Sequence, residues 1–269
     1  MAATGIDAVL RSLDAVIDQA IDDGDRAGYF AVLYRKVTAK VAEGLDAGFF
    51  DDAARMERLD TLFADRYLDA VTAHRTGGSP TASWQLAFDA GHAWRPLVLQ
   101  HLLVGINAHI NLDLGIAAAR TSPGDELSAL RRDFDRINAI LASMIASIQI
   151  DLQQISPWMG LLDRFGARTQ TEVVRFSIVT ARHGAWRFAE RLAAIPTSEW
   201  DPVVADRDQR VARVGRSILH PGPLMGAGLL LIRTRERGDV AANLAVMLGA
   251  DAPSLDEVER SLDRADPGG

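Results

Sequence analysis

Apolar residues recur about every 3.6 positions along almost the whole chain, which is the pattern of amphipathic helices. The clearest stripe lies between Leu127 and Leu152, where leucine, isoleucine or phenylalanine returns every three or four residues. Alternation of apolar and polar residues, which indicates strands, is nearly absent. Clusters rich in glycine and proline separate the stripes. The helices that these stripes and breaks predict span about residues 4–21, 26–45, 51–68, 84–95, 96–120, 127–152, 172–194, 203–219, 224–235 and 240–248.

This pattern predicts an all-α protein, folded as a single bundle of about eight to ten helices around a buried central helix over about residues 96–120. Thr4 is expected to cap the first helix, and Pro96 suits the first turn of the central one. No linker is long enough to force a division of the chain, so residues 1–252 are expected to form one domain. Residues 253–269 are expected to form a short helix and a frayed tail.

Composition and charge exclude several classes of protein. The 269 residues include no cysteine, which excludes disulfides, thiolate nucleophiles and cysteine-based zinc sites. The net charge of −7 argues against general nucleic-acid binding, because a basic surface is needed to neutralise phosphates. The N-terminal segment lacks the features of a signal peptide, and the strongly apolar run 224–232 is shorter than the roughly 20 residues that cross a bilayer. The expected location is the cytoplasm, with no membrane span, and assembly into a homo-oligomer is left open.

The stretch 100–115, which reads QHLLVGINAHINLDLG, carries the chemistry of the chain. Its apolar residues point in all directions on a helical wheel, so the helix is expected to be buried. It nevertheless contains His101, Asn107, His109, Asn111 and Asp113. On the wheel His109 and Asp113 lie about 40° apart and one turn from each other, with the two asparagines on the opposite face. Buried polar groups need partners, so this helix requires a polar network, a metal ion or a water-filled cavity.

Three interpretations of this helix follow. In the first, His109 and Asp113 bind a divalent metal, and His101 or an acid from another helix completes the ligand set; imidazole and carboxylate together suit zinc, iron or manganese. In the second, the His–Asp pair acts without a metal as a general base. In the third, the pair is structural, the asparagines tie neighbouring helices together, and the protein is a non-catalytic ligand-binding or interaction protein.

The favoured interpretation is an enzyme of hydrolase, lyase or cyclase type that acts on a small, fairly apolar substrate in a cavity inside the bundle. Asn138, on the following helix, lies beside the apolar stripe and is a further candidate for the site. Tyr34, Tyr67 and Trp84 are expected to line the substrate pocket. No phosphate-binding glycine loop, Rossmann fingerprint or Gly-x-Ser-x-Gly motif occurs, and the Glu-x-x-His pairs of di-iron bundles do not occur either.

Three acids are expected to stay outside the site. Asp60 lies near the apolar face of its helix but is interpreted as a surface acid. Asp133 and Asp135 are expected to face solvent among the arginines that surround them in the sequence.

Several segments resemble an uncharacterised family of bacterial and fungal proteins, domain of unknown function 5995. They are YFAVLYRKVT (29–38), MERLDTLFADRYLDA (56–70), the central run 100–115, DFDRINAIL (133–141) and ARHGAWRFAERL (181–192). The resemblance covers about residues 28–250, and its most specific part is the central run. It implies that the central helix defines the family. The high-GC coding bias of this arginine-rich, lysine-poor chain is a hint of a bacterial source. The family name carries no activity.

Overall fold

The computed structural model describes residues 5–156 and 170–249, and these ranges contain eleven α-helices and no strand. The α-helices are α1 (Ile6–Asp23), α2 (Gly28–Asp46), α3 (Ala53–Arg75), α4 (Ala82–Gly91), α5 (Val98–Ala108), α6 (Leu114–Thr121), α7 (Leu127–Ile155), α9 (Gln170–Ala193), α10 (Trp200–Leu219), α11 (Pro223–Arg233) and α12 (Val240–Gly249). The all-α class is confirmed. The helix count exceeds the expected eight to ten partly because the central helix is divided in two. The predicted Thr4 cap and the helix and tail over 253–269 lie outside the described residues.

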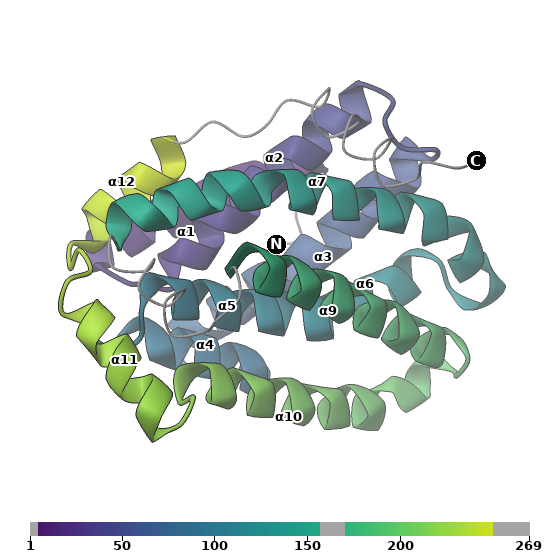
Figure 1. Cartoon of the computed structure of the whole chain (residues 1–269). Coiled ribbons are helices and arrows are strands. Elements are labelled where there is room, and N and C mark those ends of the chain that lie inside the picture. The colour runs from purple at the N-terminus through teal and green to yellow at the C-terminus, as the bar shows by residue number, and fades with distance from the viewer. Residues whose placement is uncertain (1–4, 157–169, 250–269) are drawn as a thin grey trace.

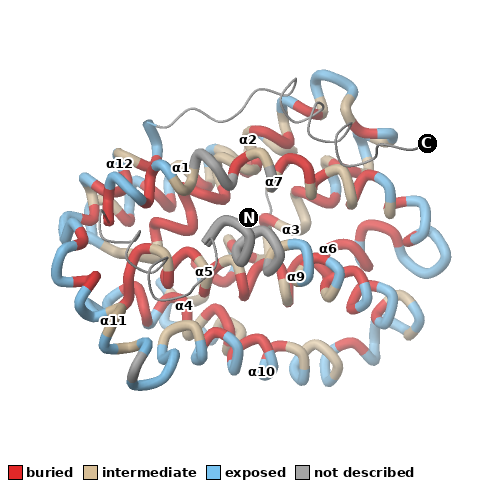
Figure 2. Tube along the Cα trace, in the orientation of Figure 1, coloured by how far each residue is buried: buried red, intermediate tan, exposed pale blue. Residues whose placement is uncertain are grey.

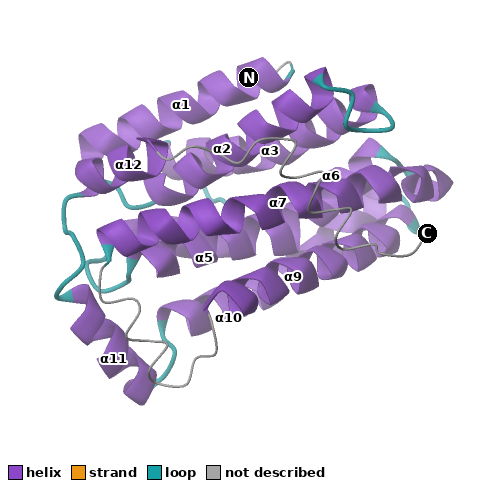
Figure 3. Cartoon of the chain, turned by 45° about the horizontal axis from the view of Figure 1, so that its top comes forward, coloured by secondary structure: helices purple, strands orange, loops and turns teal. Residues whose placement is uncertain are grey.

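The central rod consists of α5, a π-helical segment over His109–Asp113 (the π segment) and α6. Helices α2, α4 and α10 pack against α5, while α3 and α9 pack against α6 (Figure 1). Helix α7 contacts both α2 and α9, which closes the bundle over the rod (Figure 3). Buried positions run along the whole rod (Figure 2), as expected for a helix that is apolar all round.

The rod begins two residues later than expected, at Val98 instead of Pro96. Leu97 keeps an extended backbone at the N-cap, and its N–H donates to the side chain of Gln100 at 3.0 Å. The N–H of Val98 donates to the carboxylate of Glu236 at 3.2 Å. These two acceptors satisfy the first backbone donors, so the proline stays just outside the helix.

By length and composition alone, the stretch Val98–Thr121 could cross a membrane. In the structure, 83% of its most apolar 18-residue segment is buried inside the protein. In the sequence analysis, a different segment, 224–232, was considered as the long apolar run. In the structure, the surface of the central rod is covered by neighbouring helices and not left open.

Two glycines allow helices to touch the backbone of the rod. A Cβ atom added at Gly105 would lie 2.5 Å from Cγ of Phe30, which comes from α2. One added at Gly115 would lie 2.7 Å from Cδ1 of Phe188 and 2.8 Å from the carbonyl oxygen of Ala185, both on α9. Larger side chains at these two positions would push α2 and α9 away from the rod.

Asp133, which was expected to face solvent, is buried at 1% exposure. Its carboxylate accepts the backbone N–H groups of Asp51 at 2.8 Å and Asp52 at 3.1 Å, and it pairs with Arg136 at 3.0 Å and Arg55 at 3.5 Å. Asp133 therefore fixes the start of α3 to α7. The expectation for it was wrong because the N–H groups that bind it come from a loop far away in the sequence.

We expect Asp133→Ala to lower the free energy of unfolding by about 3–5 kcal/mol, because it leaves two backbone N–H groups without their acceptor and removes a buried carboxylate partner from Arg136 and Arg55. The matched control is Asp135→Ala on the same helix. Asp135 pairs with Arg131 at 2.7 Å, but both side chains are more than 40% exposed, so a loss below about 1 kcal/mol is expected. Urea denaturation of the two variants measures the difference, and equal losses would contradict the capping role.

Candidate functional site

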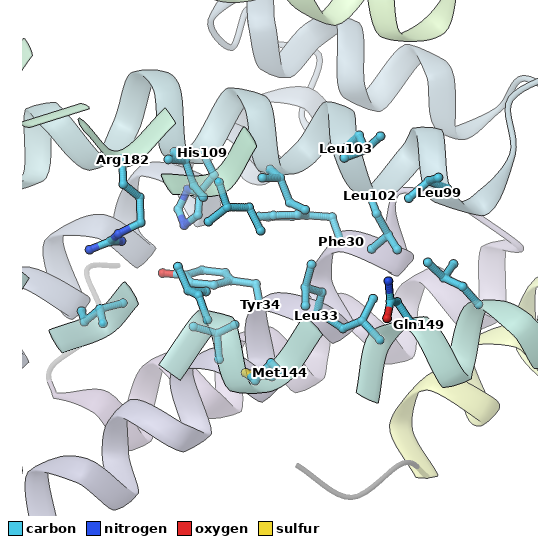
Figure 4. A pocket seen from close by; sticks show the side chains of 18 of the residues that line it. Phe30, Leu33, Tyr34, Leu99, Leu102, Leu103, His109, Met144, Gln149 and Arg182 are labelled. Carbon is cyan, nitrogen blue, oxygen red and sulfur yellow. The ribbon is translucent and has the colours of Figure 1, made fainter. Parts of the chain in front are cut away.

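A cavity of about 110 Å³ lies beside the π segment, between α2, α3, α5, α7 and α9 (Figure 4). Most of its wall consists of leucine, isoleucine, valine and phenylalanine side chains. Among the described residues, the polar side chains that line it are those of His109, Tyr34, Gln149 and Arg182. A concave apolar space with a few polar groups is the usual form of a small-molecule site.

Asp113 is the most buried polar residue of the π segment, with 0% exposure. Its carboxylate accepts the indole N–H of Trp84 at 2.7 Å and the Nε–H of Arg66 at 3.1 Å. The third contact is with Nδ1 of His109 at 3.3 Å. Three donors from α4, α3 and the π segment thus meet one carboxylate, which is how a buried charge is retained in a protein interior.

His109 is held from several sides and faces the cavity. Its ring stacks on Phe63, with 3.5 Å between centroids and 9° between planes, and the Tyr34 ring lies edge-on at 4.4 Å. Burial lowers its pKa below the ordinary value of 6.5, although the hydrogen bond to Asp113 acts in the opposite direction. The imidazole is therefore neutral at physiological pH.

The contact with Asp113 also determines the tautomer of His109. A carboxylate oxygen accepts, so Nδ1 carries the proton and Nε2 carries the free electron pair. Nε2 is buried and has no hydrogen-bond partner among the described residues. An oriented neutral imidazole with an unoccupied acceptor can remove a proton from a bound molecule.

The asparagines of the central run lie on the α10 side of the rod. Nδ2 of Asn107 donates to the carbonyl of Val211 at 2.9 Å, and Nδ2 of Asn111 donates to Oδ1 of Asn107 at 3.1 Å. The carbonyl of Asn111 in turn accepts from Arg207 at 2.8 Å. Neither asparagine lines the cavity. Their contacts are those of the structural interpretation, in which they tie helices together.

The three residues predicted as metal ligands are not brought together. His109 and Asp113 are adjacent, but His101 packs beside Tyr29, with 6.0 Å between ring centroids, and does not line the cavity. Burial, with Arg26 and Arg233 nearby, lowers the pKa of His101 to about 3. The part of the chain that the structure describes holds no group of three or more histidine or acidic side chains suited to a metal. These residues do not fit zinc, iron or manganese.

Of the remaining predicted site residues, some line the cavity and others do not. Tyr34 lines the cavity as expected. Tyr67 and Trp84 lie near His109 but line other hollows. Both line a small one next to His101, and Tyr67 also lines one between α1, α3 and α4. Asn138 accepts a hydrogen bond from Nε of Arg182 and so supports a residue of the cavity wall.

Arg182 is a cavity residue that sequence reasoning missed. It is only 2% exposed, and its Nη2 donates to the carbonyl of Phe134 at 2.5 Å. Burial lowers its pKa to about 9. A signal was present in the sequence, because Arg182 falls on the same apolar stripe of α9 as Ala185, Trp186 and Ala189. Arg66, the partner of Asp113, was missed as well.

The interpretation of Asp60 as a surface acid was wrong. It is buried at 6% exposure instead of lying at the surface, and its Oδ2 atom has no partner among the described residues. Burial raises its pKa to about 7, and the nearby charge of Glu57 contributes in the same direction.

Comparison with known proteins gives one result. The model of the family of unknown function DUF5995 matches residues 6–221, so the match begins earlier and ends earlier than the range 28–250 over which the sequence resembles that family. No curated protein and no solved structure matches the chain significantly.

Asp60→Asn should stabilise the protein in a pH-dependent way. The pKa of Asp60 is about 7 in the folded protein and near 3.8 in the unfolded chain. Between these two pH values, the folded state holds the proton while the unfolded state releases it. The free energy of unfolding therefore falls as the pH rises from about 3.8 to about 7. Above that range, the full cost of burying the ionised carboxylate is present. We expect a gain of roughly 2–4 kcal/mol near pH 8 and almost none near pH 4.

Urea denaturation at both pH values measures this effect. Asp69→Asn is the matched control, since Asp69 is exposed on the same helix. A gain that is equal at the two pH values would show that the Asp60 carboxyl group is not the cause.

Proposed function

Since this chain belongs to the family of unknown function DUF5995, we propose its function from the cavity itself: it is an enzyme that uses His109 as a general base on a small, apolar substrate. The observation that carries this proposal is the free Nε2 of a neutral, oriented imidazole at the wall of an apolar cavity. A buried acceptor without a partner costs roughly 1–3 kcal/mol, and a bound substrate with an acidic C–H or O–H group would meet it.

The chemistry would begin with transfer of a proton from the substrate to Nε2 of His109. The imidazolium ion that forms is stabilised by Asp113, which already contacts Nδ1 at 3.3 Å. Arg182 and Tyr34 line the same cavity and supply N–H and O–H donors for the negative charge that develops on the substrate. Return of the proton to another atom of the substrate, or departure of a leaving group, completes an isomerisation or an elimination.

The apolar wall favours this type of reaction over hydrolysis. Hydrocarbon side chains do not hold an attacking water molecule in place, whereas they do hold an apolar substrate. Desolvation also strengthens the interactions of the carboxylate and the imidazole with developing charge.

A non-catalytic ligand-binding protein is the second candidate, favoured by the nearly complete hydrocarbon lining of the cavity. In that case His109 and Asp113 serve only to hold α3, α4 and the π segment together. The two functions differ in what happens to a bound molecule, and a probe reaction separates them.

The test uses nitrobenzisoxazole, a small aromatic compound that reports on bases in apolar sites. The base removes its ring C–H proton, the N–O bond breaks, and a coloured cyanophenolate forms. We expect His109→Gln to lower the rate by about 100-fold or more, the usual contribution of a general base. The wild-type rate should fall with decreasing pH only below 6.5, because the pKa of His109 is lowered.

His183→Gln is the control, because His183 is exposed on α9 and lies outside the cavity. It should react like the wild type. Binding of the probe without any loss of rate in His109→Gln would refute the enzymatic proposal and leave the binding function. Absence of both binding and turnover in the wild type would refute the two functions together.

A further inference from the structure

Arg182 is a buried cation, and its hydrogen-bond partners among the described residues are neutral. Its Nε donates to Oδ1 of Asn138 and its Nη2 to the carbonyl of Phe134, and neither acceptor carries a charge. The acid that acts on it from a distance is Asp135, which is itself paired with Arg131 at 2.7 Å. Within the described residues, no ion pair includes Arg182. A charge that is removed from water in this way is costly unless a partner of opposite sign is present.

The guanidinium group has donors to offer such a partner. It carries five N–H groups, and the bonds to Asn138 and Phe134 use two of them. Arg182 also lines the cavity, where Figure 4 shows its guanidinium group at the same end as the His109 ring and the Tyr34 hydroxyl group. The opposite end, near Leu99 and Leu102, is hydrocarbon apart from Gln149.

The charges around the cavity set the charge of the ligand. The pKa of His109 is lowered and that of Tyr34 is raised well above 10, both through burial, so both groups are neutral at physiological pH. Gln149 carries no charge either. Among the described residues that line the cavity, Arg182 is thus the single charge. A singly charged anion balances it, whereas a dianion such as a phosphate monoester would leave negative charge in hydrocarbon.

The volume sets the size of the ligand. The cavity of about 110 Å³ is somewhat smaller than the roughly 150 Å³ of an engineered apolar cavity that binds benzene. A hydrocarbon body of about that size fills the space. Among small monoanions, a carboxylate matches the flat, forked donors of a guanidinium group best.

We propose that the substrate of the cavity is a small amphiphile with one carboxylate group, which pairs with Arg182, and a short hydrocarbon body, which lies between Phe30 and Leu102. This rests on the proposed function only in taking the cavity as the substrate site. Pairing with Arg182 also gives the substrate a fixed direction, because the hydrocarbon end can enter only the apolar end of the cavity.

The test compares hexanoate with hexanamide by isothermal titration calorimetry. The two compounds have nearly the same shape and differ by one negative charge. We expect the wild-type protein to bind hexanoate at least tenfold more tightly, and the difference should disappear in Arg182→Gln. A series from butanoate to octanoate should show an optimal chain length, because the cavity has a limited volume.

Arg187→Gln is the matched control, since Arg187 is exposed on the same helix and does not line the cavity. It should keep the preference for hexanoate. Hexanoate should also inhibit the reaction of nitrobenzisoxazole competitively, which places both compounds in one cavity. Arg182→Gln also loses bonds to Asn138 and Phe134; if it fails to fold, the comparison of the two compounds on the wild type decides alone.

Equal binding of hexanoate and hexanamide by the wild type would overturn the inference, and so would a preference that survives in a folded Arg182→Gln variant. Different results would contradict the proposed function. If hexanoate is preferred but His109→Gln does not slow the probe reaction, the cavity binds carboxylates without base catalysis. If the probe reaction depends on His109 but the charge of the ligand has no effect, the inference alone is wrong.

Discussion

The site depends on one buried carboxylate. Asp113 lies in the middle of the long apolar rod, and the fold must bring donors to it. Trp84 from α4 and Arg66 from α3 supply two of them, which fixes the positions of those helices against the rod. His109 supplies the third, so the same interaction that satisfies the charge also orients the imidazole. Stability and chemistry are therefore coupled through a single residue.

The packing around the rod makes the cavity possible. Gly105 and Gly115 let α2 and α9 approach the rod so closely that side chains touch its backbone. Phe30, brought in by the first of these contacts, has its ring centroid 5.5 Å from that of His109 and forms part of the cavity wall. Close approach at Gly105 thus brings a large aromatic side chain from α2 to the wall of the cavity.

The sequence predicted what depends on local pattern. Apolar stripes located the helices, and the helical wheel placed His109 next to Asp113. It also placed the asparagines on the other face, where they bind α10. The π segment was not predicted, because a turn that is one residue wider has no local signature in the sequence.

Charged residues were the main source of error. Asp60, Asp133 and Arg182 all fall on apolar stripes, yet the two acids were assigned to solvent and the arginine was missed. Burial of each depends on contacts between separate helices, such as the start of α3 for Asp133 and α7 for Arg182. His101 failed as a metal ligand for a related reason: two turns along the rod, it faces a different set of neighbours. For these residues, a position on an apolar stripe indicated burial more reliably than a charged side chain indicated exposure.

The π segment makes the position of the polar pair independent of the helices on both sides of it. A π turn absorbs one additional residue locally, so the helical segments on both sides of it keep their orientation. A homologue shorter by one residue here would form an unbroken α-helix, with glycines still facing α2 and α9. It would, however, present a different side chain to Phe63 and Trp84. A difference of one residue at this point therefore changes the His–Asp pair while the bundle stays the same.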